Sequence, residues 1–212
     1  MKASTTIFST KDKAIRKSLQ VVLRRELEKY RSESGHPAEI FEELGVQHGV
    51  ARIDLAVVNG VMHGYEIKSD LDTLQRLPEQ MKEYNTVFDK LTLVVGRSHV
   101  CEAINIIPDW WGVMVARTNE NNEVFFHIIR EAEDNKEQVS LSIARLLWRA
   151  EALKILEEKN KAAGVRSKPR ELIYERLASV LDIDNLKDYV RNTLLVSRKD
   201  WRVGVSLVTS GD

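Results

Sequence analysis

The stretch Ala51–Asp70, ARIDLAVVNGVMHGYEIKSD, decides the fold of this chain. It contains two runs of alternating apolar and polar residues, separated by Asn59-Gly60. Side chains on a β-strand point to opposite faces in turn, and Asn-Gly between two such runs is a strong hairpin signal. We therefore predict a β-hairpin that carries Asp54 on its first strand and Glu66 and Lys68 on its second.

The register of this hairpin follows from its apolar pattern. A plain two-residue turn at Asn59-Gly60 would pair Asp54 with Tyr65 and place polar residues against apolar ones. Shifting the register by one residue makes both faces coherent, with Asp54 opposite Glu66, Ile53 opposite Ile67, and Leu55 opposite Tyr65. Because a one-residue slip exchanges the faces, the apolar pattern should decide the register. We predict a wider turn or a β-bulge, at Gly60 or Gly64.

Composition restricts the class of protein. The 212 residues are 43% hydrophobic and 30% charged, which suits one folded domain or a domain with a small appendage. The net charge is zero, so attraction to nucleic acid must be local. Cys101 is the single cysteine, which excludes an intrachain disulfide and a multi-cysteine zinc site. With no signal-peptide core and no apolar run near the roughly 20 residues of a membrane span, we expect a soluble, cytoplasmic protein without membrane contact.

Helical and strand periodicities divide the chain near residue 135. We assign 1–135 to an α/β core and 136–212 to a C-terminal helical subdomain. In the first part we predict a helix over 14–30 capped by Ser9 or Thr10, then a strand or helical turn over 40–46, and then the hairpin. After the hairpin we predict a helix from Pro78, a buried strand over 91–95, a helix over 100–107 and strands over 112–117 and 124–130. In the second we predict one long helix over 139–158 and shorter helices over 171–181 and 186–195.

The order helix, strand, hairpin, helix, strand, read with Asp54 and Glu66-Ile67-Lys68, resembles the PD-(D/E)XK nuclease superfamily. Its members are magnesium-dependent enzymes of restriction, recombination and repair. Ile53-Asp54 stands where the superfamily name has Pro-Asp, and Glu66-Ile67-Lys68 matches the second half. Downstream, Gln80 to Tyr84 (QMKEY) is similar to the Q-x-x-x-Y element of the exonuclease-like branch. Nearly the whole chain resembles a small uncharacterised bacterial family of this superfamily, with the core match over residues 11–97.

This resemblance implies a restriction-endonuclease-like αβββαβ core with a mixed central sheet. It implies Mg²⁺, or Mn²⁺, held by Asp54, Glu66 and the carbonyl of Ile67, with Lys68 and Gln80 also catalytic. The chemistry agrees, because Mg²⁺ prefers hard oxygen ligands and a lysine can stabilise developing negative charge. The first helix of such proteins often adds an acidic residue, for which Glu26 is our candidate and Glu28 the alternative.

The expected reaction is hydrolysis of phosphodiester bonds in nucleic acid, with DNA preferred, in repair, recombination or defence. Candidate substrate-binding residues are Arg52, Ser69, Arg76, Lys82, Tyr84, Arg166, Lys168 and Arg170. A homodimer or a partner protein is compatible with the C-terminal helices. We expect Lys68→Ala to leave stability nearly unchanged if the site is open.

Other interpretations stay open. The two carboxylates and Lys68 could form an ordinary cross-strand salt bridge on a solvated face. The chain could be a catalytically silent nucleic-acid-binding module, or a protein-interaction module, on the same fold. Among the remaining residues, we expect His63 to be a satisfied buried histidine, Cys101 to be an inert buried thiol, and Trp110-Trp111 to pack in the core.

Overall fold

The computed structural model describes residues 9–198 of the chain. Within them lies a mixed sheet of six strands in the order β1-β2-β3-β4-β5-β6, with bounds β1 Glu39–Val46, β2 Ala51–Val58, β3 Met62–Lys68, β4 Lys90–Gly96, β5 Gly112–Thr118 and β6 Val124–Arg130. The β3-β4 and β4-β5 pairs are parallel, and the other pairs are antiparallel. The predicted α/β fold with an αβββαβ core and a mixed central sheet is therefore confirmed.

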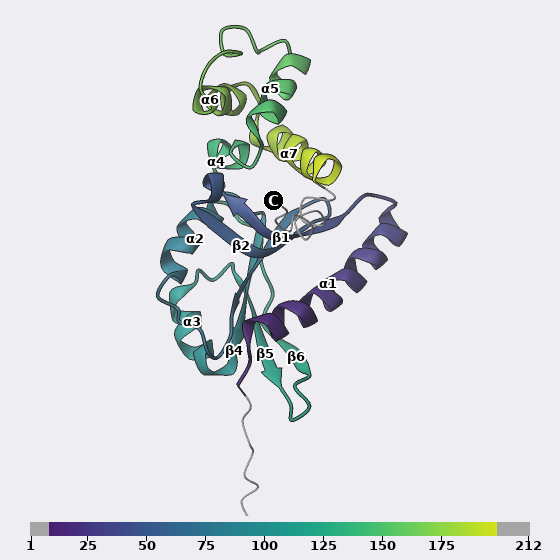
Figure 1. Ribbon diagram of the computed structural model, residues 1–212, viewed down its shortest axis with the longest axis vertical. Coiled ribbons are helices and arrows are strands. Elements are labelled where there is room, and N and C mark those ends of the chain that lie inside the picture. The colour runs from purple at the N-terminus through teal and green to yellow at the C-terminus, as the bar shows by residue number, and fades with distance from the viewer. Residues whose placement is uncertain (1–8, 199–212) are drawn as a thin grey trace, which may run out of the picture.

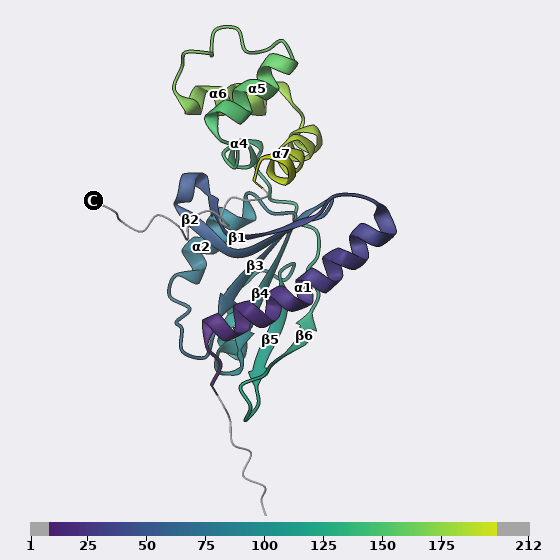
Figure 2. The same ribbon diagram turned by 45° about the vertical axis from the view of Figure 1, so that its right-hand side comes forward.

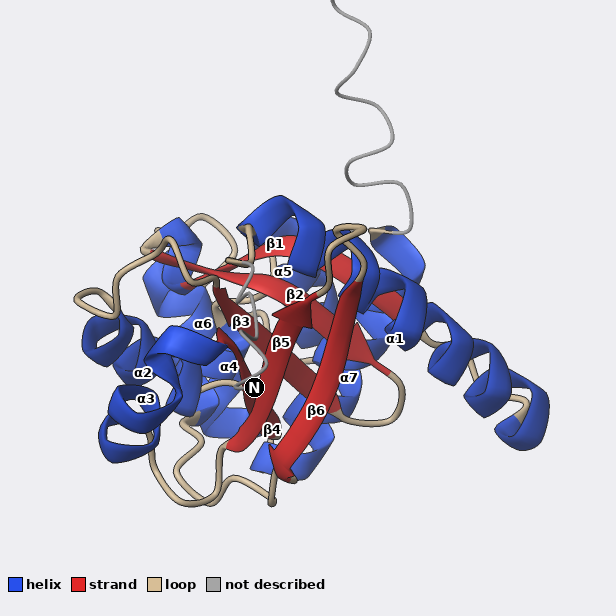
Figure 3. Cartoon of the chain, turned by 90° about the horizontal axis from the view of Figure 1, so that it is seen from below, coloured by secondary structure: helices blue, strands red, loops and turns tan. Residues whose placement is uncertain are grey.

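Helices cover both faces of the sheet and one of its ends (Figures 1, 2 and 3). Helix α1 lies on one face, α2 and α3 on the other, and the C-terminal helices gather beyond the β1–β2 end. Their bounds are α1 Asp12–Ser34, α2 Leu77–Asn85, α3 Val100–Ile106, α4 Ser140–Ala144, α5 Arg149–Glu158, α6 Arg170–Val180 and α7 Ile183–Ser197.

Helix α1 forms where its apolar stripe predicts. Ile15, Leu19, Leu23 and Leu27 are buried against the sheet, and the helix ends at Gly35, whose φ of +70° closes the last turn. The expected cap at Ser9 or Thr10 is wrong, because the N-cap position is Lys11 and gives no side-chain hydrogen bond. The Thr10 backbone N–H and hydroxyl instead donate to Asp70, each at 2.7 Å, which ties the start of α1 to the end of β3.

The hairpin has the shifted register that its apolar pattern predicts. Leu55 lies opposite Tyr65, and Val58 lies opposite Met62. The wider turn spans residues 59–61, with Gly60 at a φ of +95° and the Asn59 N–H bonded to the Val61 carbonyl. The alternative of a bulge at Gly64 is wrong, because the pairing passes through Gly64 without a shift.

The β1–β2 ribbon changes face part-way along its length. In β2, Ile53 packs in the core under α2, whereas Leu55 and Val57 pack under α1. In β1, the buried positions are Phe41, Leu44 and Val46, with a step of three residues instead of two, and Glu43 between them has a φ of +50°. Our pairing of Ile53 with Ile67 on one apolar face is therefore wrong, because Ile67 belongs to the α1 side. The change of face occurs at Asp54 and Glu43.

The predicted long helix over 139–158 is wrong. It is broken between α4 and α5, because Trp148 takes an extended conformation and its N–H donates to Glu151 at 2.7 Å as α5 starts. Leu146 and Leu147 are both buried at the break, so the apolar periodicity hid it. Helices α6 and α7 agree with the prediction within two or three residues at each end.

Helix α7 is joined to the sheet by ionic contacts. Asp89, which precedes β4, accepts the Met62 N–H at 2.7 Å and lies 2.8 Å from Lys187 and 3.6 Å from Arg191. Because Asp89 is buried, these contacts fix the C-terminal helices to the end of the core.

Some of the remaining sequence expectations are confirmed and one is wrong. His63 bonds with Thr92 at 2.8 Å and with Tyr65 at 3.2 Å, so it is satisfied as expected. Trp111 is fully buried, but Cys101 is exposed and the expectation of a buried thiol is wrong. Among residues 9–198, no helix is both long enough and apolar enough to cross a membrane.

Candidate active site

A polar cavity of about 710 Å³ opens where β2 separates from β3. Seven of its described lining residues are carboxylates and four are cations: Asp12, Glu43, Asp54, Glu66, Asp72, Glu79 and Glu83 against Arg16, Arg52, Lys68 and Arg76. Helix α1, strands β1 to β3 and helix α2 all contribute to it. The excess of negative charge favours a cation here and disfavours a phosphate that arrives without one.

A buried ion pair forms the floor of this acidic pocket. Lys68 Nζ donates to Glu66 Oε1 at 2.6 Å and to Gln80 Oε1 at 3.0 Å. The exposed fractions of the whole residues are 2% for Glu66 and 5% for Lys68, so this is no solvated surface pair. Helix α2 begins at Leu77, with Pro78 in its first turn as predicted, and this start directs Gln80 into the pocket.

Tyr84 closes the network from beneath. Its hydroxyl lies 2.5 Å from the Arg52 carbonyl and 3.0 Å from Glu66 Oε2, and it accepts the Gln80 amide at 3.3 Å. The hydroxyl has one proton, so it can donate to one of its two acceptors at a time. Burial, and then the charge of Asp54, raise the pKa of Glu66 to about 7 despite Lys68. Near neutral pH, Glu66 is therefore poised between its protonated and ionised forms.

Asp54 sits where the ladder between β2 and β3 ends. Its Oδ2 accepts the Ile67 N–H at 2.7 Å, and its Oδ1 accepts Arg16 Nη2 at 2.5 Å. Arg16 Nη1 also reaches Glu43 Oε1 at 2.8 Å, so one guanidinium from α1 joins β1 to β2. Burial raises the pKa of Asp54, although Arg16 and the Ile67 N–H oppose the change.

Several predicted residues meet in this pocket and others lie elsewhere. Besides Asp54, Glu66, Lys68 and Gln80, the pocket is lined by Ile67, Arg52 and Arg76, while Tyr84 lies behind it. Glu26 does not join them. It lies with His63, Tyr65 and Glu131 at a cavity on the α1 side of the sheet, because it follows Leu23 by less than one turn. The acidic residue that α1 brings to the pocket is Asp12.

The other proposed phosphate contacts lie outside the acidic pocket. Ser69 donates its N–H and hydroxyl to Asp72, at 2.8 and 2.6 Å, and Lys82 pairs with Glu79 at 2.7 Å in solvent. Arg166 and Lys168 are exposed in the loop between α5 and α6, where Arg166 pairs with Glu157. Arg170 lines a second cavity, between the β1–β2 ribbon and the C-terminal helices.

Sequence reasoning missed Arg16 and Glu43. Nothing in the helical stripe of α1 shows that Arg16 reaches the hairpin, because the crossing of α1 over the sheet is a tertiary feature. Glu43 did leave a signal, namely the step of three between Phe41 and Leu44. Such a step in a strand indicates a change of face, at which a polar side chain turns toward solvent or a site.

The donor set fits one divalent cation. Asp54 is close enough to Glu66 for its charge to raise the pKa of Glu66, and each carboxylate now has a cation as counter-charge, Arg16 or Lys68. The Ile67 carbonyl would be the third protein oxygen, and Mg²⁺ usually retains several waters beyond such a set. Among residues 9–198, no group of three or more His, Cys, Asp or Glu side chains is arranged as a metal cluster. A cation held by this set would take its remaining ligands from water or substrate.

These features define an α/β protein with a mixed sheet that holds two carboxylates and a lysine at the open end of a hairpin. The chain belongs to the bacteriophage P4 protein cII family, whose model matches residues 14–200. It is 36% identical over 94 residues to "Protein cII" of Enterobacteria phage P4, a match that covers 44% of this chain and 35% of that relative. The chain therefore spans about a third of the relative's length. No solved structure matches the chain significantly.

Proposed function

We propose that this protein is a metal-dependent nuclease that hydrolyses phosphodiester bonds in nucleic acid, with DNA as the preferred substrate and Mg²⁺ or Mn²⁺ as cofactor. The observation that carries the proposal is the meeting of Asp54, Glu66, Lys68 and Gln80 in one acidic pocket. Four residues from three elements, singled out by their resemblance to the PD-(D/E)XK superfamily, share this cavity. An ordinary surface salt bridge would require neither the burial of Glu66 nor Gln80 as a third partner.

The side chains of the pocket have separate tasks in this proposal. Asp54 and Glu66 hold the cation, which when bound polarises the phosphate and offsets charge that develops during hydrolysis. Arg16 fixes the orientation of Asp54, because its guanidinium contacts both Asp54 on β2 and Glu43 on β1. Lys68, held by Gln80, stabilises negative charge on the phosphate in the transition state. Tyr84 fixes Glu66, and hydrogen bonds from Tyr84 and Lys68 favour its ionised form.

The test is a cleavage assay on mixed single- and double-stranded DNA and RNA, with Mg²⁺, Mn²⁺, Ca²⁺ or a chelator. We expect metal-dependent cleavage by the wild type and a loss on the order of 10²–10³ in rate for Asp54→Asn and for Glu66→Gln, as for loss of other key electrostatic groups. Glu79→Gln is the matched control, because Glu79 lines the same cavity but is exposed, and its one ion pair among residues 9–198 is with Lys82. Absence of cleavage with every metal, or full activity in both variants, would overturn the proposal.

A second candidate is a nucleic-acid-binding protein that does not cleave. It is favoured by one observation, that each carboxylate of the pair already has a protein cation beside it. Calorimetry with Mg²⁺ and Mn²⁺ separates the two candidates. If the wild type binds metal and Glu66→Gln does not, the result supports the nuclease. Nucleic-acid binding without metal binding supports the second candidate.

A further inference from the structure

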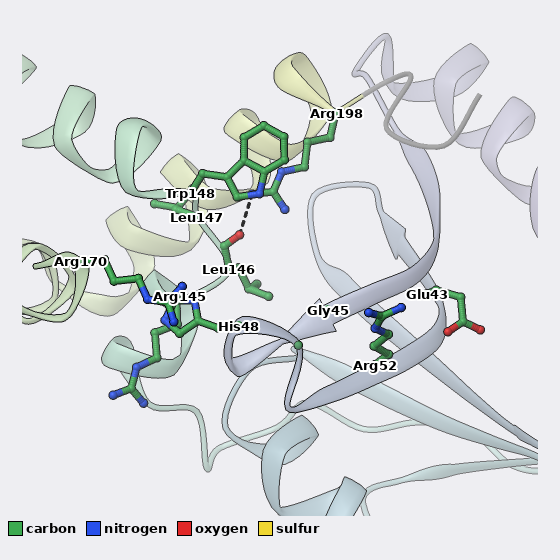
Figure 4. Close-up of a pocket in the computed structure, with 11 residues that line it drawn as sticks. Glu43, Gly45, His48, Arg52, Arg145, Leu146, Leu147, Trp148, Arg170 and Arg198 are labelled. Atoms are coloured by element: carbon green, nitrogen blue, oxygen red, sulfur yellow. Dashed lines mark hydrogen bonds between the residues drawn. The ribbon is translucent and has the colours of Figure 1, made fainter. Parts of the chain in front are cut away.

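A second cavity, of about 360 Å³, lies next to the acidic pocket. It is formed between the β1–β2 ribbon, with its connecting turn Gln47–Gly49, and the C-terminal helices. Figure 4 shows that its cations come from both sides, with Arg52 on the ribbon and Arg145, Arg170 and Arg198 on the helical region. We call this the basic pocket.

Two of the four arginines in the basic pocket are neutralised by carboxylates of the protein, and the other two are not. Arg145 forms a two-pronged contact with Glu171, at 3.1 and 2.9 Å, and Arg198 lies 2.9 Å from Glu151. The guanidinium groups of Arg52 and Arg170 have no hydrogen bond or ion pair to any residue from 9 to 198. Two available arginines on opposite walls of a cavity suit an anion with more than one charged oxygen, such as a phosphodiester backbone.

The wall of the basic pocket also presents an aromatic surface. Trp148 is a large apolar residue with 50% of its surface exposed, and the Arg198 guanidinium lies 4.6 Å from its ring centroid. It owes this position to the break between α4 and α5, where it takes an extended conformation. An exposed aromatic ring in a pocket lined by arginines is the combination by which proteins hold unpaired bases and their phosphates, because any base can stack on an aromatic ring.

The two pockets are adjacent and have part of their lining in common. Glu43, Gly49 and Arg52 line both of them. Gly49 has a φ of +90°, and a Cβ built there would meet no atom within 4 Å, so the space beside this shared residue is open. One strand of nucleic acid can therefore contact both pockets, with its scissile phosphate in the acidic pocket and a neighbouring nucleotide in the basic one.

We propose that the basic pocket binds one unpaired nucleotide of the substrate strand, with its base against Trp148 and its phosphates on Arg52 and Arg170. The substrate class is then single-stranded nucleic acid, or a duplex with a single-stranded end, because a base inside a duplex is already stacked on its neighbours and cannot stack on Trp148. This inference rests on the proposed nuclease function, which identifies the anion as a nucleic-acid backbone. It gives the C-terminal helices a role in holding the substrate.

The test is fluorescence anisotropy with the full chain, a chelator and a labelled oligonucleotide, either single-stranded or annealed as a blunt duplex. We expect tighter binding of the single strand, and a loss of affinity of about tenfold in Arg170→Gln and in Trp148→Ala, with Trp148→Phe retaining most of it. Arg176→Gln is the matched control, because Arg176 is an exposed arginine on the same helix that does not line the pocket. Circular dichroism melts establish that each variant is folded.

Two results would overturn this inference. One is equal affinity for the duplex and the single strand with no effect of Arg170→Gln or Trp148→Ala. The other is binding of a free mononucleotide as tight as that of the oligonucleotide, which would indicate a nucleotide site without a strand. Because affinity is measured without metal, the binding result can be interpreted even if the protein shows no cleavage. Conversely, cleavage that does not depend on Arg170 and Trp148 removes this inference alone.

Discussion

Replacing Lys68 with alanine should destabilise the fold by an amount that depends on pH. The expectation from sequence, a small change at an open site, does not survive the structure, because Lys68 is 5% exposed and pairs with buried Glu66 at 2.6 Å. Removing one partner of a buried ion pair typically costs about 3–5 kcal/mol, since the other charge is left without compensation. Glu66 can avoid this cost only by taking up a proton.

The pKa of Glu66 determines how far this protonation reduces the loss of stability at a given pH. The pKa is 4.5 in the unfolded reference and about 7 in the fold, so the native state binds more protons between these values and stability falls as pH rises through them. Without Lys68 the folded pKa rises further and this fall extends to higher pH. We expect Lys68→Ala to cost about 3–5 kcal/mol at pH 8 and about 1 kcal/mol at pH 5, where protonation is nearly free.

The assay is urea unfolding at both pH values, followed by tryptophan fluorescence, to which fully buried Trp111 contributes. Lys82→Ala is the control, because Lys82 is an exposed lysine whose pair with Glu79 lies in solvent, and it should change stability by under about 0.5 kcal/mol at both pH values. A double variant with Glu66→Gln should remove most of the pH dependence. An equal, small loss in Lys68→Ala at pH 5 and pH 8 would refute this account of the buried pair.

Three further predictions concern metal binding and stability. Affinity for Mg²⁺ or Mn²⁺, measured by calorimetry, should rise from about pH 6 to pH 8, because Glu66 with its pKa of about 7 must lose its proton to bind metal. An affinity that does not change with pH would exclude Glu66 as a ligand. Tyr84→Phe should cost about 1–3 kcal/mol in urea unfolding, because the one hydroxyl proton shared by Glu66 and the Arg52 carbonyl is lost, and unchanged stability would contradict the network. Asp89→Asn should cost about 3 kcal/mol and speed hydrogen exchange in α7, because Lys187 loses its buried counter-charge; protection equal to the wild type would show that apolar packing alone holds the helix.

The local patterns of the chain predicted most of the fold. Each predicted strand is present, and the hairpin register follows from the apolar pattern around Leu55 and Tyr65. The break between α4 and α5 was not predicted, because Leu146 and Leu147 continue the helical periodicity although they pack from a non-helical segment. Periodicity records which side chains are buried, and it does not record whether the backbone between them is continuous.

The candidate site was predicted in part. Residues on the hairpin and on α2 could be placed together, because strand alternation and the start at Pro78 fix their directions locally. The choice of Glu26 failed, because the angle at which α1 crosses the sheet decides which of its turns reaches the pocket. That angle depends on packing between distant residues, and no local pattern around Asp12 or Arg16 encodes it.

The change of face in the β1–β2 ribbon limits how this family can vary in length. Both strands turn over at the same level, at Glu43 and Asp54, and the pairing of the ribbon stays in register on either side. Losing or gaining one residue in only one strand would bring apolar side chains to the surface over half of that strand. We therefore expect insertions and deletions among relatives to be rare here, and to occur in β1 and β2 together.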